Sequence, residues 1–89
     1  MNECFLCGRN GSGDRLERHH IFGGANRDLS EKYGLCVLLC GDRCHRNGKY
    51  AAHRNAETAE YLHRWGEEKA IKEGMTREQF RELFGKDYL

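Results

Sequence analysis

The chain has 89 residues, of which 38% are hydrophobic and 33% charged, and it contains five cysteines and no proline. A chain of this length forms one small domain with a thin core, and such domains often need a metal or disulfides to stay folded. The net charge of +1 argues against a broad nucleic-acid-binding stripe. Its apolar runs are shorter than the roughly 20 residues of a membrane span.

The small net charge conceals an asymmetry between the two parts of the chain. Residues 1–54 hold nine basic and six acidic side chains, whereas residues 55–89 hold six basic and eight acidic ones. This distribution favours a compact contact between the first part and a polyanion. The first residues lack the basic and apolar regions of a secretory signal, so we expect a cytoplasmic protein with reduced thiols. Reduced thiols favour metal binding over disulfides.

The first half of the chain predicts a hairpin preceded by a metal-binding turn. Cys4 and Cys7 flank a short turn, and Gly8 lets the backbone return toward a metal. The apolar runs at residues 16–22 and 35–39 predict two strands paired through a long loop, with one helical turn at residues 30–33. The segment 40–45 leads into a helix or turn.

The second half predicts two helices. Asn55 can cap a helix over residues 56–73, in which His63 is expected at the surface. Thr76 and Gln79 have the spacing of a capping box for a last helix that ends near Phe84. We therefore predict a single α+β domain over residues 1–89, with a metal-binding core in residues 4–54 and a helical extension in residues 55–89.

Four of the five cysteines form two close pairs, a pattern typical of a structural zinc site. Cys4 and Cys7 have two residues between them, and Cys40 and Cys44 have three. Both spacings let a turn aim two sulfurs at one ion, so we predict one structural Zn²⁺ bound by all four. The alternative is that some of them are only buried thiols, which is how we interpret Cys36.

The histidines suggest a second site with a different chemistry. Neighbouring side chains of a strand point to opposite faces, so His19 and His20 need not share a role. One can bind a metal while the other faces a substrate. His45 follows Cys44 directly, and its ring is expected to point away from the zinc. A histidine that is neutral near pH 7 can accept a proton from water.

The segments Arg18–Phe22 and Leu39–His45 together resemble the motifs of the HNH, or His-Me finger, nucleases. The resemblance covers residues 4–54 and implies a small zinc-stabilised ββα-metal domain, in which a β-hairpin and a helix surround one divalent ion. The whole chain, with two helices at its C-terminal end, is also similar to small single-domain HNH proteins encoded by bacteriophages and prophages.

The resemblance implies a role for each histidine of the motifs. His20 would be the general base, while His19 and His45 would bind the catalytic ion, which could be Mg²⁺, Mn²⁺, Ni²⁺ or Zn²⁺. The family's middle asparagine is replaced here by Gly34 and Leu35, and Asn26 is the candidate to support the loop in its place.

His53 is the candidate third ligand of the catalytic ion. Eight residues of continuous helix from His45 would rise about 12 Å, which is too far for both to bind one ion. Either the chain breaks at Asn47 and Gly48 and folds back, or His53 is a surface residue beside Arg54.

The implied reaction is metal-assisted hydrolysis of phosphodiester bonds in DNA. Basic side chains near the motifs would contact the phosphate backbone with low sequence specificity, because such contacts position nucleic acid without reading its bases. These residues are Arg18, Arg27, Arg43, Arg46 and Lys49. Phage proteins are possible further partners, and a phage-encoded protein would act in the host cytoplasm.

Two other functions are compatible with parts of the sequence. A zinc-stabilised nucleic-acid-binding or adaptor module would use the same cysteines and basic residues without catalysis. A protein-interaction domain would use the acidic helical half, with residues 1–54 as its scaffold. The adjacent imidazoles of His19 and His20 favour the nuclease, because a binding module has no need for them beside a third histidine.

Overall fold

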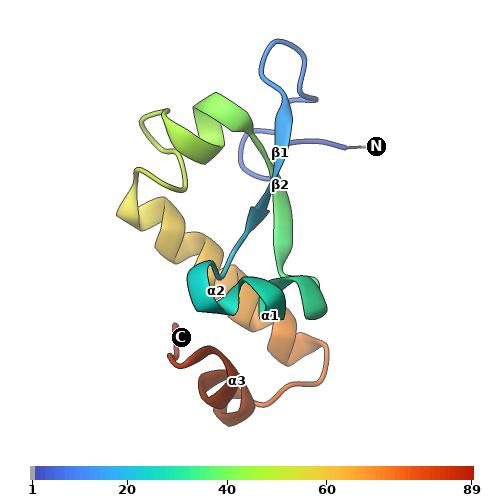
Figure 1. The fold of residues 1–89 in the computed structure, drawn as a ribbon, viewed down its shortest axis with the longest axis vertical. Helices are drawn as coiled ribbons and strands as arrows, with labels where there is room; N and C mark the ends of the chain where they lie inside the picture. Colours follow the sequence, from blue (N-terminus) through green and yellow to red (C-terminus); the bar gives the residue numbers. More distant parts are fainter. Residues whose placement is uncertain (1) are drawn as a thin grey trace.

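A hairpin of two strands and a set of helices make up the part of the chain described by the computed structural model, residues 2–89 (Figure 1). In chain order the elements are β1 (Leu16–His20), the short turn η1 (Gly24–Asn26), α1 (Arg27–Lys32), β2 (Cys36–Cys40), the wide helical turn η2 (Gly41–Arg46), α2 (Ala56–Lys72) and α3 (Arg77–Phe84). This is the α+β class predicted from the sequence. None of the helices in residues 2–89 has the length and apolar character needed to cross a membrane.

The two strands form the predicted hairpin with a defined register. They are antiparallel, and Leu16 lies opposite Cys40 while His20 lies opposite Cys36. The first strand ends two residues earlier than predicted because the backbone of Phe22 leaves the ladder. Its N–H donates instead to the Ser30 hydroxyl, at 3.0 Å.

Helix α1 is longer than the predicted turn, since it begins at Arg27. Ser30, on this helix, is completely buried and also donates its hydroxyl hydrogen to the carbonyl oxygen of Phe22 at 2.7 Å. The Ser30 side chain therefore fixes α1 against the segment that follows β1. The helix is followed by Gly34, whose φ of +69° lies in the left-handed region that glycine adopts readily.

Helices α2 and α3 begin as their capping residues predict. The side chain of Asn55 accepts a hydrogen bond from the backbone N–H of Thr58 at 2.9 Å. Thr76 and Gln79 form the reciprocal bonds of a capping box, and Gly85 ends α3 in the left-handed conformation. Helix α2 ends at Lys72, one residue before the predicted position.

The core joins the hairpin to the C-terminal helices through one aromatic residue. The ring of Phe22 lies 5.3 Å from that of Phe80 and 4.8 Å from that of Phe84, centroid to centroid. A Cβ atom on Gly66 of α2 would come within 2.8 Å of the Phe22 ring, so only glycine allows this close approach. The helical extension thus packs against the residues that directly follow His20.

His63 is not the plain surface residue expected from the sequence. Its ring stacks on Phe22 at 5.3 Å and lies 4.5 Å from the ring of Tyr88. Burial lowers the pKa of His63, which favours the neutral ring. We therefore assign His63 to the packing between α2 and the C-terminal segment.

The C-terminal segment is held by a buried carboxylate on α2. Oε1 of Glu67 accepts a hydrogen bond from the backbone N–H of Tyr88 at 2.6 Å, and the side chain is completely buried. Within residues 2–89, Oε2 of Glu67 is buried without a hydrogen-bond partner. Burial raises the pKa of Glu67, because the charged form loses its hydration.

Candidate metal centres

The four paired cysteines meet at one end of the hairpin. Cys4 and Cys7 come from the N-terminal turn, Cys40 ends β2, and Cys44 lies in η2. Their sulfur atoms all lie within 4.8 Å of one another. The backbone N–H of Phe5 donates to the carbonyl oxygen of Leu38 at 2.8 Å, which fixes the N-terminal turn against β2. The four cysteines are therefore close enough to hold one structural metal ion such as zinc.

The spacing and surroundings of the thiols fit such an ion. Sulfurs at about 2.3 Å from a tetrahedral zinc stand about 3.8 Å apart, and those of Cys7 and Cys40 are 3.5 Å apart. The sulfur of Cys4 accepts backbone N–H groups from Cys7 at 3.4 Å and from Cys40 at 3.5 Å. Such donors stabilise thiolates, which are the ligand form that zinc requires.

Burial and their mutual contacts affect the ionisation of the thiols in opposite directions. Burial, followed by hydrogen bonds with Cys7 and Cys4, raises the pKa of Cys40 to about 11, and the same causes raise the pKa of Cys44. The pKa of Cys7 falls to about 6: burial would raise it, but hydrogen bonds from Arg9 and from the neighbouring thiols outweigh that effect. Four thiolates can coexist here only if a bound cation offsets their repulsion.

Three histidines form a second cluster beside the thiols. Ring nitrogens of His19, His45 and His53 lie within 4.8 Å of one another. The Nε2 atoms of His45 and His53 are 3.1 Å apart, close to the spacing of about 3.4 Å expected for two imidazoles on one tetrahedral zinc. Neutral imidazole is a good ligand for zinc, nickel and copper, so this donor set fits a divalent ion.

A reversal of the chain brings His53 to this cluster. After η2 the backbone turns back at Asn47 and Gly48, and the N–H of His53 donates to the carbonyl oxygen of His45 at 3.0 Å. A Cβ atom on Gly48 would lie 1.9 Å from the carbonyl oxygen of Arg43, so only glycine fits. This is the chain break that a shared site for His45 and His53 required.

Glu17 fixes the orientation of the His45 ring. Oε1 of Glu17 lies 2.8 Å from Nδ1 of His45, and Oε2 lies 2.9 Å from the guanidinium of Arg46. The hydrogen bond from His45, with the charge of Arg46, lowers the pKa of Glu17, so the carboxylate is ionised. An ionised carboxylate only accepts hydrogen bonds; Nδ1 therefore carries the hydrogen, and Nε2 is free to bind a metal.

His19 is the most buried of the three histidines and stays neutral. Its ring lies 5.0 Å from that of His45 and 5.1 Å from that of His53. Burial, followed by the nearby charges of His45 and His53, lowers its pKa to about 4. At neutral pH His19 therefore presents an unprotonated nitrogen, the form in which imidazole binds metals.

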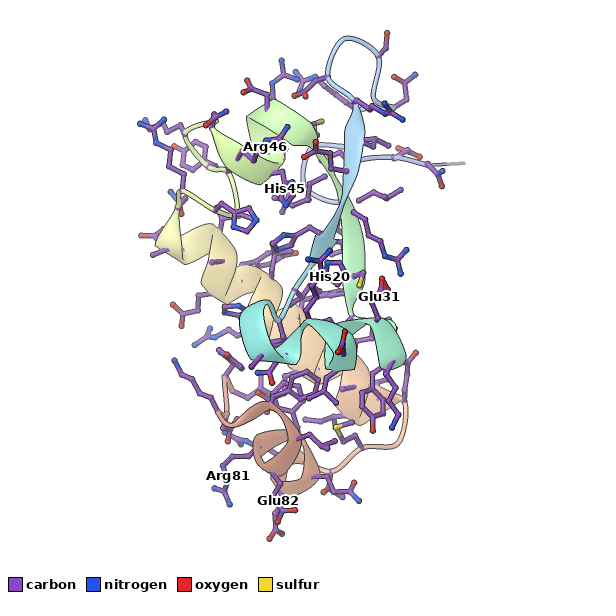
Figure 2. The ribbon with its side chains drawn as sticks, viewed as in Figure 1. His20, Glu31, His45, Arg46, Arg81 and Glu82 are labelled. Atoms are coloured by element: carbon purple, nitrogen blue, oxygen red, sulfur yellow. The ribbon has the colours of Figure 1, made fainter. Side chains whose placement is uncertain are left out.

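His20 lies at the same pocket but outside the cluster of three. The pocket has a volume of about 260 Å³ and is lined by Arg18, His19, His20, Gly23, Gly24, Arg27, His45 and His53. Nε2 of His20 is 3.2 Å from Oε1 of Glu31 on α1. Figure 2 shows these two side chains together between the hairpin and α1. The predicted base and the predicted ligands thus share one cavity.

Asn26 does not support the loop of the hairpin from within the pocket. Its side-chain amide donates to the carbonyl oxygen of Phe84 at 2.9 Å, at the end of α3. It does bond to the backbone as expected, but to a C-terminal helix. Its role is to join η1 to α3.

The five basic residues expected at the phosphate backbone are in different situations. Arg18 and Arg27 line the pocket. The guanidinium of Arg18 pairs with Glu31 at 2.8 Å, and that of Arg46 pairs with Glu17. Arg43 lies in η2, and the amine of Lys49 lies 5.5 Å from the centre of the Tyr50 ring. Within residues 2–89, Arg27 lines the pocket without a salt bridge to a carboxylate, whereas Arg18 has one.

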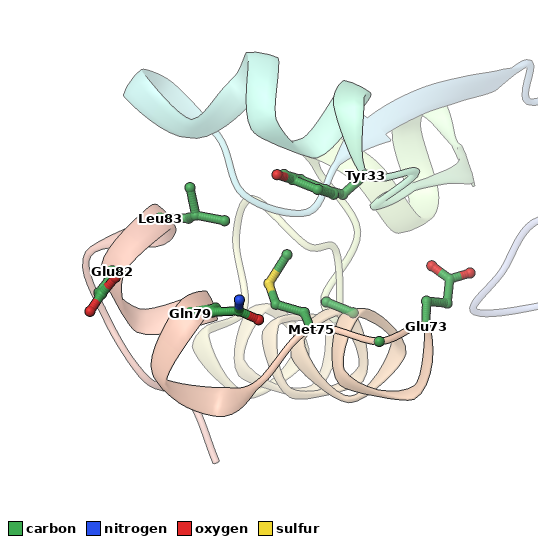
Figure 3. A pocket seen from close by; sticks show the side chains of 8 residues that line it. Tyr33, Glu73, Met75, Gln79, Glu82 and Leu83 are labelled. Carbon is green, nitrogen blue, oxygen red and sulfur yellow. The ribbon is translucent and has the colours of Figure 1, made fainter.

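A larger pocket of about 690 Å³ lies between the end of α1, the end of α2 and α3 (Figure 3). It is lined by Tyr33, Ala70, Glu73, Gly74, Met75, Gln79, Glu82 and Leu83. This lining contains no imidazole or thiol, and its two carboxylates belong to Glu73, directly after α2, and to Glu82 on α3. The smaller pocket is therefore the candidate site, because chemistry depends on its donor groups and not on its volume.

Sequence reasoning missed two carboxylates beside these histidines, those of Glu17 and Glu31. Glu17 could have been found, because residues two apart on a strand share a face and His19 is two residues further on. The sequence held no comparable signal for Glu31, whose position depends on how α1 is anchored to Phe22.

No family model, curated protein or solved structure matches this chain.

Proposed function

We propose that the protein is a metal-dependent endonuclease of the HNH type, which hydrolyses phosphodiester bonds of DNA and has a ββα-metal core. The observation that carries this proposal is the clustering of His19, His45 and His53 in one small pocket, with His20 on its wall. Three imidazole nitrogens could hold an ion, and a fourth imidazole outside the ligand set is suited to proton transfer.

The side chains of the pocket divide the task of hydrolysis. His19, His45 and His53 would hold the ion, and Glu17 keeps the His45 ring in the orientation that ligation needs. When bound, a divalent ion supplies Lewis acidity toward a phosphoryl oxygen and the leaving oxygen. His20 accepts the proton of the attacking water. Arg27 offers a positive charge for the phosphate.

The cysteine cluster has a structural task in this proposal. A zinc bound by Cys4, Cys7, Cys40 and Cys44 would fix η2, which carries His45 directly after Cys44. Small domains with thin cores gain much of their folding free energy from such ions. The zinc would therefore hold the scaffold on which the imidazole site is built.

Plasmid cleavage by the purified protein, with Mg²⁺, Mn²⁺, Ni²⁺ or Zn²⁺ added in turn, tests the proposal. His20→Ala should lower cleavage by roughly 10²- to 10⁴-fold and spare metal binding, because it removes a base and no ligand. His45→Ala should weaken both, with partial rescue by excess metal. His63→Ala is the control, since it removes an imidazole that packs on Phe22 outside the pocket; it should lower the melting temperature and, while folded, cleave DNA like the wild type. Full activity of His20→Ala, or DNA binding without cleavage under every metal, would refute the nuclease.

A further inference from the structure

A chain of charged contacts runs from β1 through α1 to the His20 ring. The Nε and Nη2 atoms of Arg18 each donate to a different oxygen of Glu31, both at 2.8 Å. The same Oε1 atom of Glu31 lies 3.2 Å from Nε2 of His20. Two-point binding by a guanidinium holds a carboxylate in a fixed plane. The position of the Glu31 carboxylate beside His20 is therefore set by Arg18.

Residues His20, Glu31 and Cys36 would satisfy the distances of a third metal site, but Arg18 argues against one. Its guanidinium already occupies both oxygens of Glu31. A divalent cation bound there would face a permanent positive charge at close range. We therefore interpret this group as an ion pair that contacts a histidine.

We propose that Glu31 is a positioning residue for His20: its carboxylate holds the Nε2–H side of the ring and leaves Nδ1 to accept the proton of water. This inference rests on the proposed nuclease function, in which His20 is the base. A carboxylate paired with Arg18 has only acceptor sites, so the ring nitrogen that faces it carries the hydrogen. The hydrogen bond from Arg18 lowers the pKa of Glu31, which agrees with a carboxylate that is ionised.

The arrangement also explains how two histidines of the pocket, one on β1 and one in η2, present different ring nitrogens. Glu17, on β1, faces Nδ1 of His45 and leaves Nε2 for a metal. Glu31, on α1, faces Nε2 of His20 and leaves Nδ1. Each carboxylate thus selects the free nitrogen of one ring. In this proposal Arg18 orients Glu31 and does not bind phosphate directly, in contrast to the role expected from the sequence.

Two measurements on the full chain test this inference separately from the function. The first is a double-mutant cycle on DNA cleavage. Glu31→Ala should lower kcat by about 10- to 100-fold with KM unchanged, as the loss of a positioning carboxylate does elsewhere. In the His20→Ala background the same change should have no further effect. A Glu31→Ala variant with normal kcat, or one with an equal loss in both backgrounds, would overturn the proposal.

The second measurement is the proton NMR signal of His20 Nε2–H, which needs no activity. A hydrogen bond to a carboxylate shifts and protects this signal in the wild type, and Glu31→Ala should remove it. Glu31→Asp keeps a carboxylate and should retain part of both the signal and kcat. Glu73→Ala is the matched control, because Glu73 directly follows α2 and pairs with Lys69 at 3.1 Å, away from His20. If the wild type fails to cleave DNA, the proposed function is wrong, and the NMR signal alone tests the hydrogen bond between His20 and Glu31. An unchanged signal in Glu31→Ala would refute that hydrogen bond.

Discussion

Replacing Gly48 by alanine should disconnect His53 from the histidine cluster. The φ angle of Gly48 is not in the left-handed region, so the requirement for glycine is one of space. The added Cβ would lie 1.9 Å from the carbonyl oxygen of Arg43, 2.8 Å from its carbonyl carbon and 3.1 Å from its Cα. Backbone atoms cannot rotate away as a flexible side chain can. The turn at Gly48 and the η2 backbone must therefore separate.

The size of that separation follows from the contact. Cβ atoms in proteins essentially never approach another atom to less than 3.0 Å, so the two segments must move apart by about 1.1 Å. Ligand distances at a metal tolerate only about 0.2 Å, and the Nε2 atoms of His45 and His53 lie 3.1 Å apart on the two sides of the turn. Gly48→Ala should therefore raise the Kd for Ni²⁺ at the imidazole site by at least about 10-fold. It should also destabilise the fold by about 1–3 kcal/mol.

Isothermal titration with Ni²⁺, after the cysteine site has been loaded with zinc, measures this affinity. Gly74→Ala is the matched control: Gly74 has a φ of +114° and open space around it, so alanine there costs backbone strain and leaves the pocket intact. Both variants should melt at lower temperature, and only Gly48→Ala should lose Ni²⁺ affinity. Wild-type affinity in Gly48→Ala would refute the assignment of His53 as a ligand.

Three further predictions concern the metals and the buried carboxylate. Cys4→Ser should unfold the protein or sharply lower its melting temperature, whereas Cys36→Ser should do neither; folded protein that contains no tightly bound zinc would contradict this. Mild chelation should abolish cleavage while the helical circular dichroism persists, because imidazoles release an ion before thiolates do; simultaneous loss of both would indicate a single metal site. Glu67→Gln should stabilise the protein at pH 7 by about 1 kcal/mol. The folded-state pKa of Glu67 is raised, so the protonated side chain stabilises the fold at low pH, and this contribution is lost as the pH rises through that pKa. The gain of the glutamine variant should therefore vanish below about pH 4. A gain that is independent of pH in urea denaturation would contradict this prediction.

Local signals in the sequence were sufficient for most of the secondary structure. The helix starts at Asn55 and Thr76 were predictable because a capping side chain acts on N–H groups only two or three residues away. The two close pairs of thiols were predictable because the spacing within each pair is a local property of the sequence. The ends of β1 and α1 were not, because both depend on the bonds between Ser30 and Phe22, eight residues apart.

The candidate site was only partly accessible from the sequence for the same reason. The alternation of a strand separated His19 from His20, and a helix rise showed that His53 needs a reversal at Gly48. The carboxylate contacts of Glu17 and Glu31 depend on tertiary placement. His63 was misplaced because its charged neighbours on α2 concealed its contact with Phe22, which comes from a distant part of the chain.

The adjacency of Cys44 and His45 would couple metal binding at the two clusters thermodynamically. Both residues lie in the single turn η2, so any ligand that orders this turn for one cluster prepares it for the other. Binding free energies linked in this way are reciprocal: zinc at the thiols would raise the affinity of the imidazoles for their ion, and an ion at the imidazoles would raise the affinity of the thiols for zinc by the same factor. Because thiolates bind zinc more tightly than imidazoles, the cysteine cluster would be filled first. A shortage of zinc would then weaken ion binding at the imidazole pocket although the residues of that pocket are unchanged.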